Sequence, residues 1–243
     1  MPKKDSGNWE QKIPAPNSAI GVITPICTKV HWGNDANRAP VGGNVRKRVK
    51  TNINKIETIM NNQFERLNKE WKLYLENSAE QMQEDIRNML TGKIVRYKQG
   101  KVQQDIAALY FEYEYEYMNI TFWAENKNEI LLTDVTELPT IMRNNGKPNS
   151  NWKHFIPETI WKEVIESEDE FEGDEDEYYE ARDEYTNKST ELFEKWFFDC
   201  WKAAIKGMEN IPDAYFSIHD TNWRTDLKTG KEMSIAEISK RYK

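Results

Sequence analysis

A histidine and an aspartate stand side by side at positions 219 and 220, directly after the apolar run AYFSI (214–218). Just beyond a strand, His219 could act as a general base that Asp220 orients. An adjacent His-Asp pair also occurs in ordinary turns, where Asp and Asn side chains hydrogen-bond the backbone. We therefore expect a strand-end turn here, with His219 and Asp220 as the alternative catalytic candidates.

Three glutamates alternate with aromatic residues in the stretch LYFEYEYEYMNITFW (109–123). A period of two places Glu112, Glu114 and Glu116 on one face of a strand and the rings on the other. With the His-Asp pair, such a row would suit a hydrolase or nuclease. A glutamate row more often faces water or a Lys/Arg row on the next strand, so an enzyme is the third of our functional hypotheses.

Two metal-binding patterns fail on spacing. Cys27 and His31 form a C-x3-H pair, but two further ligands at recognisable spacing are missing. An EF-hand loop with Gly173 at its sixth position needs a bidentate glutamate where the chain has Tyr179. Nothing resembles a phosphate-binding loop, a dinucleotide fingerprint or a nucleophile elbow. We therefore expect neither a metal site nor a cofactor.

The acidic run ESEDEFEGDEDEYYEARDE (166–184) holds twelve carboxylates and one cation. Two interpretations stay open, a solvated loop, as blocks of like charge usually are, and a surface for a basic partner. Interleaved aromatic residues favour the second, because rings are costly to expose and often anchor interfaces. The expected partner-binding residues are Glu168, Asp169, Glu170, Phe171, Glu172, Asp174, Glu175, Asp176, Glu177, Tyr178 and Tyr179.

Charge is distributed unevenly along the chain. Residues 1–50 carry nine Lys/Arg and three Asp/Glu, whereas the chain as a whole has a net charge of −7. Arg46, Lys47 and Arg48 begin a predicted helix, where cations oppose the helix dipole. They are an anion-binding candidate, with a solvated cluster as the alternative. Such an uneven charge distribution affects which partners a protein binds rather than which fold it adopts.

The clearest predicted element is a helix over 45–91, which Gly92 ends. Apolar or small residues recur in ten steps over 36 positions, or 3.6 per step. A coiled coil would hold a period of 3.5, so we expect one straight helix that packs its stripe on the domain. The stripe is Ile53, Ile56, Met60, Phe64, Leu67, Trp71, Leu75, Ala79, Met82, Ile86 and Met89.

The whole pattern predicts an α+β fold in which an antiparallel sheet packs with the long amphipathic helix and a buried aromatic-rich helix. The stretch 109–123 is expected to pair with ILLTDV (130–135) across the turn ENKNE. Ser234 and Glu237 form a capping box that starts a short terminal helix. The other expected elements are a helix opening at Pro157, the aromatic-rich helix over 188–206, and strands over 214–218 and 223–227.

Two parts make up the predicted chain, an extended Pro/Gly-rich arm over 1–43 and a single α+β domain over 44–243. The apolar residues of 13–32 predict that this part of the arm packs against protein, because burial must offset the entropy of ordering. Two cysteines give no disulfide framework and fit a reducing compartment. We expect a cytoplasmic protein without a signal peptide or a membrane span.

These features favour a non-enzymatic binding protein. The leading hypothesis is a bacterial or phage inhibitor of the immunity-protein type, whose acidic-aromatic segment occupies a basic protein partner. The alternative is a structural or assembly subunit that self-associates through the arm and the long helix. Direct binding of nucleic acid is not expected.

Overall fold

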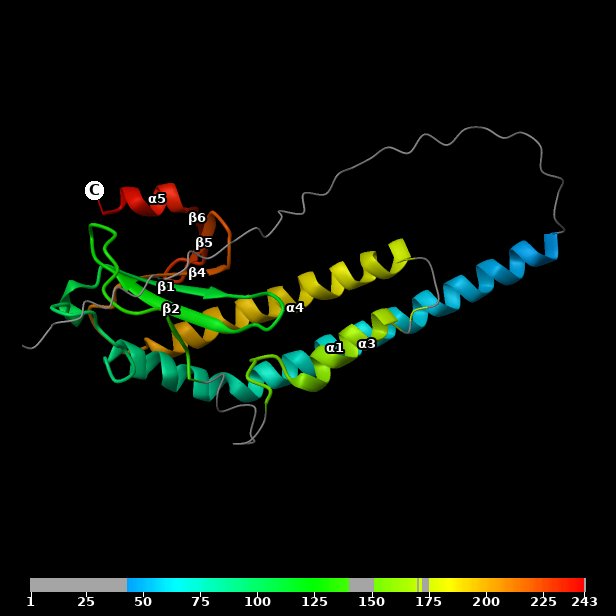
Figure 1. Ribbon diagram of the computed structural model, residues 1–243, viewed down its shortest axis with the longest axis horizontal. Helices are drawn as coiled ribbons and strands as arrows, with labels where there is room; N and C mark the ends of the chain where they lie inside the picture. Colours follow the sequence, from blue (N-terminus) through cyan, green and yellow to red (C-terminus); the bar gives the residue numbers. More distant parts are fainter. Residues whose placement is uncertain (1–42, 140–150, 170, 172–174, 243) are drawn as a thin grey trace, which may run out of the picture. The chain divides into compact units, whose positions relative to one another are not determined.

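The computed structural model describes residues 43–139, 151–169, 171 and 175–242, with side chains from Met60 onward except that of Asp169. The α+β class is confirmed, because these residues form helices and a mixed sheet (Figure 1). The arm, and any packing or self-association through it, lies outside the described residues, as do Cys27 and His31. No helix within the described ranges is long and apolar enough to cross a membrane.

The long helix α1 spans Gly43–Leu90, as the 3.6-residue period predicts. Its apolar stripe is buried from Met60 to Met89, except that Ala79 is half-buried. Gly92 has a φ of 75°, the left-handed conformation that glycine adopts easily, and its N–H donates to the Met89 carbonyl at 2.9 Å. The helix therefore ends where the sequence predicts.

The described residues form a six-stranded sheet in the order β3-β2-β1-β4-β5-β6. Neighbouring strands are antiparallel except β1 and β4, which run parallel. The expected antiparallel sheet is therefore a mixed one, since the chain crosses from one of these strands to the other through helices rather than a tight turn. The strands are β1 (Ala108–Tyr113), β2 (Ile120–Glu125), β3 (Thr136–Glu137), β4 (Asp213–Ile218), β5 (Trp223–Asp226) and β6 (Lys231–Ser234).

The first hairpin turns earlier than the alternation predicts. A single strand over 109–123 is wrong, because the chain reverses at residues 114–119, between β1 and β2. Met118 adopts a φ of 55° in this turn, and its N–H donates to the Glu114 carbonyl at 2.7 Å. The alternation thus runs past the end of β1, and Tyr115 is exposed. Residues 130–135 contribute only isolated bridges before β3.

The described residues also form the α-helices α3 (Glu158–Asp169), α4 (Glu175–Ala204) and α5 (Ile235–Lys240), and a short 3-10 helix, η1 (Gln103–Asp105). The predicted helix over 188–206 is the second half of α4. The first half of α4 was not predicted from the sequence, because the many charged residues there obscure the apolar stripe. Acidic residues nevertheless suit the first turn of a helix, because they face the positive end of its dipole. The predicted capping box is confirmed, because Ser234 Oγ accepts from the Glu237 N–H at 3.3 Å.

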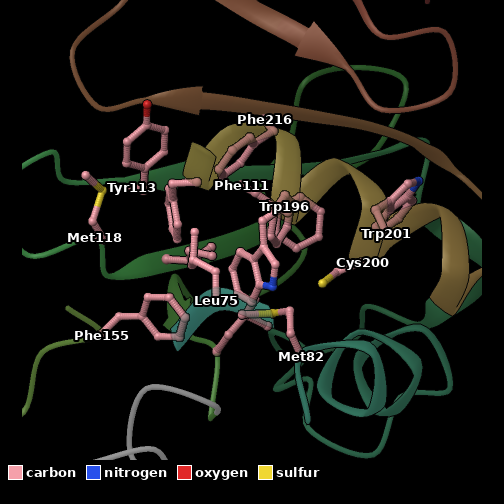
Figure 2. Packing of buried hydrophobic residues seen from close by; sticks show 14 of the residues in the cluster. Leu75, Met82, Phe111, Tyr113, Met118, Phe155, Trp196, Cys200, Trp201 and Phe216 are labelled. Atoms are coloured by element: carbon pink, nitrogen blue, oxygen red, sulfur yellow. The ribbon is translucent and has the colours of Figure 1, made fainter. Parts of the chain in front are cut away.

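The helices α1 and α4 lie on one side of the sheet and α5 on the other (Figure 1). Aromatic rings fill the core between sheet and α4, where the Phe111 ring of the sheet contacts Trp201 at a centroid distance of 5.6 Å (Figure 2). The Phe197 and Phe216 ring centroids are only 4.2 Å apart. Cys200 of α4 is buried with its Sγ 3.8 Å from the Ala79 carbonyl oxygen of α1, and burial raises the pKa of its thiol to about 12. Large aromatic rings are thus prominent among the fully buried side chains of this core.

Candidate functional site

The acidic run belongs to two helices. Its first residues complete α3, and the residues from Glu175 onward open α4. The described part of the run is therefore helical rather than a loop, except at Phe171, and both a solvated surface and a surface for a basic partner stay open. Among the predicted partner-binding residues, Glu170, Glu172 and Asp174 lie outside the described residues, as does the side chain of Asp169.

Most carboxylates of the run face solvent. Arg182 is its only cation, and Arg182 Nη1 lies 2.6 Å from Glu168 Oε2. One cation cannot balance so many carboxylates, so this surface is strongly negative. We call it the acidic surface, and its exposed members are Glu166, Glu168, Glu175, Asp176, Tyr179, Glu180, Asp183 and Glu184.

The aromatic residues of the run divide between core and surface. Tyr178 is only 2% exposed, and its hydroxyl lies 3.0 Å from Ser167 Oγ. The expectation that Tyr178 offers a surface contact does not fit this burial, because its ring falls on the apolar stripe of α4 beside Phe64 and Phe171. Tyr179 is 45% exposed and is the aromatic side chain that the acidic surface presents.

The two helix ends affect these carboxylates differently. Glu175 and Asp176 lie in the first turn of α4, where the dipole favours negative charge. Glu166 and Glu168 lie near the last turn of α3, where it opposes negative charge. Helix stability therefore accounts for the acids of α4 but not for those of α3. Arg182 and the Tyr179 hydroxyl, which donates to Glu168 at 3.2 Å, bind one of these unfavoured carboxylates.

The basic cluster lies where the pattern predicts, near the start of α1. Arg46, Lys47 and Arg48 follow its first residue, Gly43, and the first turn holds no acidic residue. Their side chains are outside the described part of the chain, so their role as an anion-binding candidate stays a prediction.

His219 and Asp220 lie in a turn directly after β4. The distance from His219 Nδ1 to Asp220 Oδ2 is 3.0 Å, with 55% and 89% of the two side chains exposed. Asp220 has a φ of 60°, in the left-handed region that Asp tolerates better than most residues. The pair is therefore formed, but in open solvent.

The three strand glutamates do not form one row. Glu112 lies on β1, whereas Glu114 and Glu116 are exposed in the turn that follows. Arg224 on β5 donates to Glu112 Oε1 at 2.7 Å and to Ser217 Oγ at 2.9 Å. The expected alternatives are water or a Lys/Arg row on the next strand, whereas Glu112 pairs with one arginine on β5, which is not the strand next to β1.

Arg224 is the important residue that the sequence analysis missed. Its guanidinium carbon lies 5.1 Å from the Tyr110 ring centroid and 5.6 Å from that of Trp123, so the cation contacts two aromatic faces. Its ionic partner lies on β1, two strands away in the order β1-β4-β5. Only the strand order reveals that pairing, because β1 and β5 are far apart in sequence.

A cleft of about 370 Å³, the outer cleft, opens on the sheet beside Arg224 and its contacts with Glu112 and Trp123. The cleft brings His219 together with Glu112 and Glu114, and Trp123 and Glu137 also line it. Carboxylates beside an aromatic ring suit a cationic group. No set of three or more His, Cys, Asp and Glu that could hold a metal ion occurs in the ranges that the structure describes.

Comparison with known proteins gives no assignment. No protein-family model matches the chain, and neither a curated protein nor a solved structure matches it. The acidic surface is therefore the feature of the described residues on which the functional proposal rests.

Proposed function

We propose that the protein is a non-enzymatic binding protein whose acidic surface captures a basic protein partner. The observation that carries this proposal is the position of Glu166 and Glu168 near the C-terminal end of α3. Carboxylates there cost the helix about 0.5 kcal/mol each, because they face the negative end of its dipole. Glu166 is exposed to solvent and available to a partner, whereas Arg182 and the Tyr179 hydroxyl already bind Glu168.

Charge density gives the acidic surface its second support. The run 166–184 carries twelve carboxylates and one cation. Such a patch steers an oppositely charged partner and raises its association rate, an effect that salt screens over a Debye length of about 8 Å at 0.15 M. Tyr179 would add short-range contact, since tyrosine is enriched among the residues that anchor interfaces.

The partner would present a basic groove, such as a nuclease active site or another nucleic-acid-binding surface. Occupying that groove makes this protein an inhibitor of the immunity-protein type, acting in the cytoplasm of a bacterium or a phage-infected cell. A reducing compartment is compatible with Cys200, which is a free, buried thiol.

The experiment compares two variants with the same change in net charge. The first replaces four exposed carboxylates of the acidic surface, Glu175→Gln, Asp176→Asn, Glu180→Gln and Asp183→Asn. The matched control replaces four exposed carboxylates elsewhere, Glu80, Glu84, Glu116 and Glu129, each with Gln. Wild type and both variants are used in parallel to capture proteins from the native host, with quantification by mass spectrometry.

We expect the wild type and the control to capture the same basic protein, and the acidic-surface variant to lose it. Capture that survives the acidic-surface substitutions, or that falls equally in both variants, would contradict the proposal. The first outcome would place binding elsewhere, and the second would show that only net charge matters.

A further inference from the structure

A hollow of about 160 Å³ lies between α1 and α4, next to the acidic surface. Each helix contributes four residues at relative positions zero, three, four and seven, so each set occupies one helix face. Glu184 belongs both to this hollow and to the acidic surface. The lining residues are Asn61, Phe64, Glu65 and Asn68 from α1, and Ala181, Glu184, Tyr185 and Lys188 from α4.

Asn68 is the unusual residue of this lining. It is only 4% exposed, and its Oδ1 has no hydrogen-bond partner within the described ranges. A buried polar atom without a partner destabilises the fold, and most such atoms in folded proteins are paired. A ligand with a hydrogen-bond donor that enters the hollow could therefore satisfy Asn68 Oδ1.

We propose that this hollow receives a lysine side chain of the basic partner, whose ammonium donates a hydrogen bond to Asn68 Oδ1. The inference rests on the proposed function, because it identifies one contact of that partner. It concerns a single buried acceptor, whereas the proposed function concerns the charge of the whole acidic surface. The two can therefore fail separately.

The lining suits a lysine better than other donors. An ammonium is compact and carries three donors, and the carboxylates of Glu65, which also pairs with Lys69, and Glu184 are further acceptors in the lining of the hollow. Phe64 and Tyr185, whose ring centroids are 5.1 Å apart, offer an apolar wall for the alkyl stem. Burial raises the pKa of Tyr185, so its hydroxyl stays neutral at physiological pH.

Lys188 is the one cation among the residues that line the hollow. It is exposed and would repel an incoming ammonium. The proposal therefore predicts that substitutions at Asn68 and Lys188, which line the same hollow, change the affinity for an ammonium in opposite directions. Removing the acceptor at Asn68 should weaken binding, and removing the charge at Lys188 should strengthen it.

The direct test titrates the isotopically labelled full-length protein with n-butylammonium chloride, which reproduces the lysine side chain, and follows the Asn68 side-chain amide by NMR. Butanol has the same stem without the charge, and butylguanidinium represents arginine. We expect butylammonium to shift the Asn68 signals saturably and more strongly than either comparison compound. Unshifted signals, or equal shifts with butanol, would overturn the proposal and leave the hollow to water.

Substitutions at Asn68 test the proposal by butylammonium affinity, without the need to assign the Asn68 NMR signals. A hydrogen bond to a charged group contributes about 1.5–3 kcal/mol, so Asn68→Leu should weaken butylammonium binding at least about tenfold. Asn68→Asp, which keeps the acceptor and adds charge, should strengthen it. Equal affinities in the Leu and Asp variants would overturn the proposal even if one of them were less stable.

A final comparison separates this inference from the proposed function. The four-carboxylate variant of the acidic surface leaves Asn68, Glu65 and Glu184 in place, so it should bind butylammonium nearly as wild type does. If that variant loses capture of the basic protein but keeps butylammonium, both proposals stand. If wild-type protein captures its partner while Asn68→Leu captures it equally well, the lysine site is wrong and the proposed function survives.

Discussion

Arg182 on α4 donates a 2.6 Å hydrogen bond to Glu168 near the end of α3, and so joins the two helices that carry the acidic surface. Both side chains are about one-third exposed, which makes the pair worth less than about 1 kcal/mol. Arg182→Gln should therefore lower the free energy of unfolding only slightly. It also removes the one cation of the run, so a basic probe should associate faster. A slower association in this variant would contradict the steering role of the surface.

Charge at the two helix ends should have opposite effects on stability. Glu175→Gln with Asp176→Asn should lower the free energy of unfolding by about 0.5 kcal/mol per site, because the dipole of α4 favours these acids. Glu166→Gln near the end of α3 should raise it by a similar amount. Urea denaturation at low ionic strength measures both. The same sign for both variants would show that dipoles do not govern these carboxylates.

Two adjacent tyrosines provide a matched comparison of core and surface. Tyr178→Ala should cost about 3 kcal/mol, because it removes a buried ring and leaves a cavity. Tyr179→Ala should leave the melting temperature nearly unchanged but speed dissociation of the captured partner. Calorimetry and surface plasmon resonance give the two readouts. A large stability loss in the Tyr179 variant would mean that its ring has a structural role.

Stability should depend on pH through Glu194. Burial raises the pKa of this carboxyl, and the 2.6 Å hydrogen bond from the Tyr113 hydroxyl only partly offsets the rise. The folded state thus holds the proton more tightly than the unfolded chain. That contribution to stability is fully present below the unfolded pKa of about 4.3 and is lost as the pH rises through the folded pKa.

Glu194→Gln keeps an acceptor for the Tyr113 hydroxyl and removes this titration. The wild type should therefore lose more free energy of unfolding than the variant as the pH rises from acidic to neutral, and the variant should be the more stable protein at neutral pH. Urea titrations at matched pH values measure the difference. Parallel pH profiles for the two proteins would contradict the assignment.

Local patterns predicted the parts of the fold that depend on local interactions. The period of α1 and the capping box of α5 were both readable, because each is determined by residues a few positions apart. The early turn at Met118 was not, since the Glu-Tyr alternation continues through it. The start of α4 was hidden because its stripe is spaced among carboxylates, with Tyr178 and Tyr185 as its early buried members.

The candidate site was only partly predictable for the same reason. The acidic run is visible as composition, and its exposed carboxylates follow from that. The Arg224–Glu112 pair and the hollow at Asn68 both depend on which elements pack together, and the parallel pairing of β1 with β4 has no local signature. Asn68 lies beside the apolar stripe of α1, so its burial follows from the packing of α4 rather than from its own sequence context.

The most direct test of the central claim is the association rate of fluorescent octalysine with the full-length protein, measured by stopped flow across a range of NaCl concentrations. Wild type and the control variant with substitutions at Glu80, Glu84, Glu116 and Glu129 should both show a rate that falls steeply with salt. The variant with Glu175→Gln, Asp176→Asn, Glu180→Gln and Asp183→Asn should associate about tenfold more slowly at low salt and show a shallower slope. If this variant and the control bind octalysine at the same rate at low salt, the acidic surface does not steer basic partners and the proposed function is wrong.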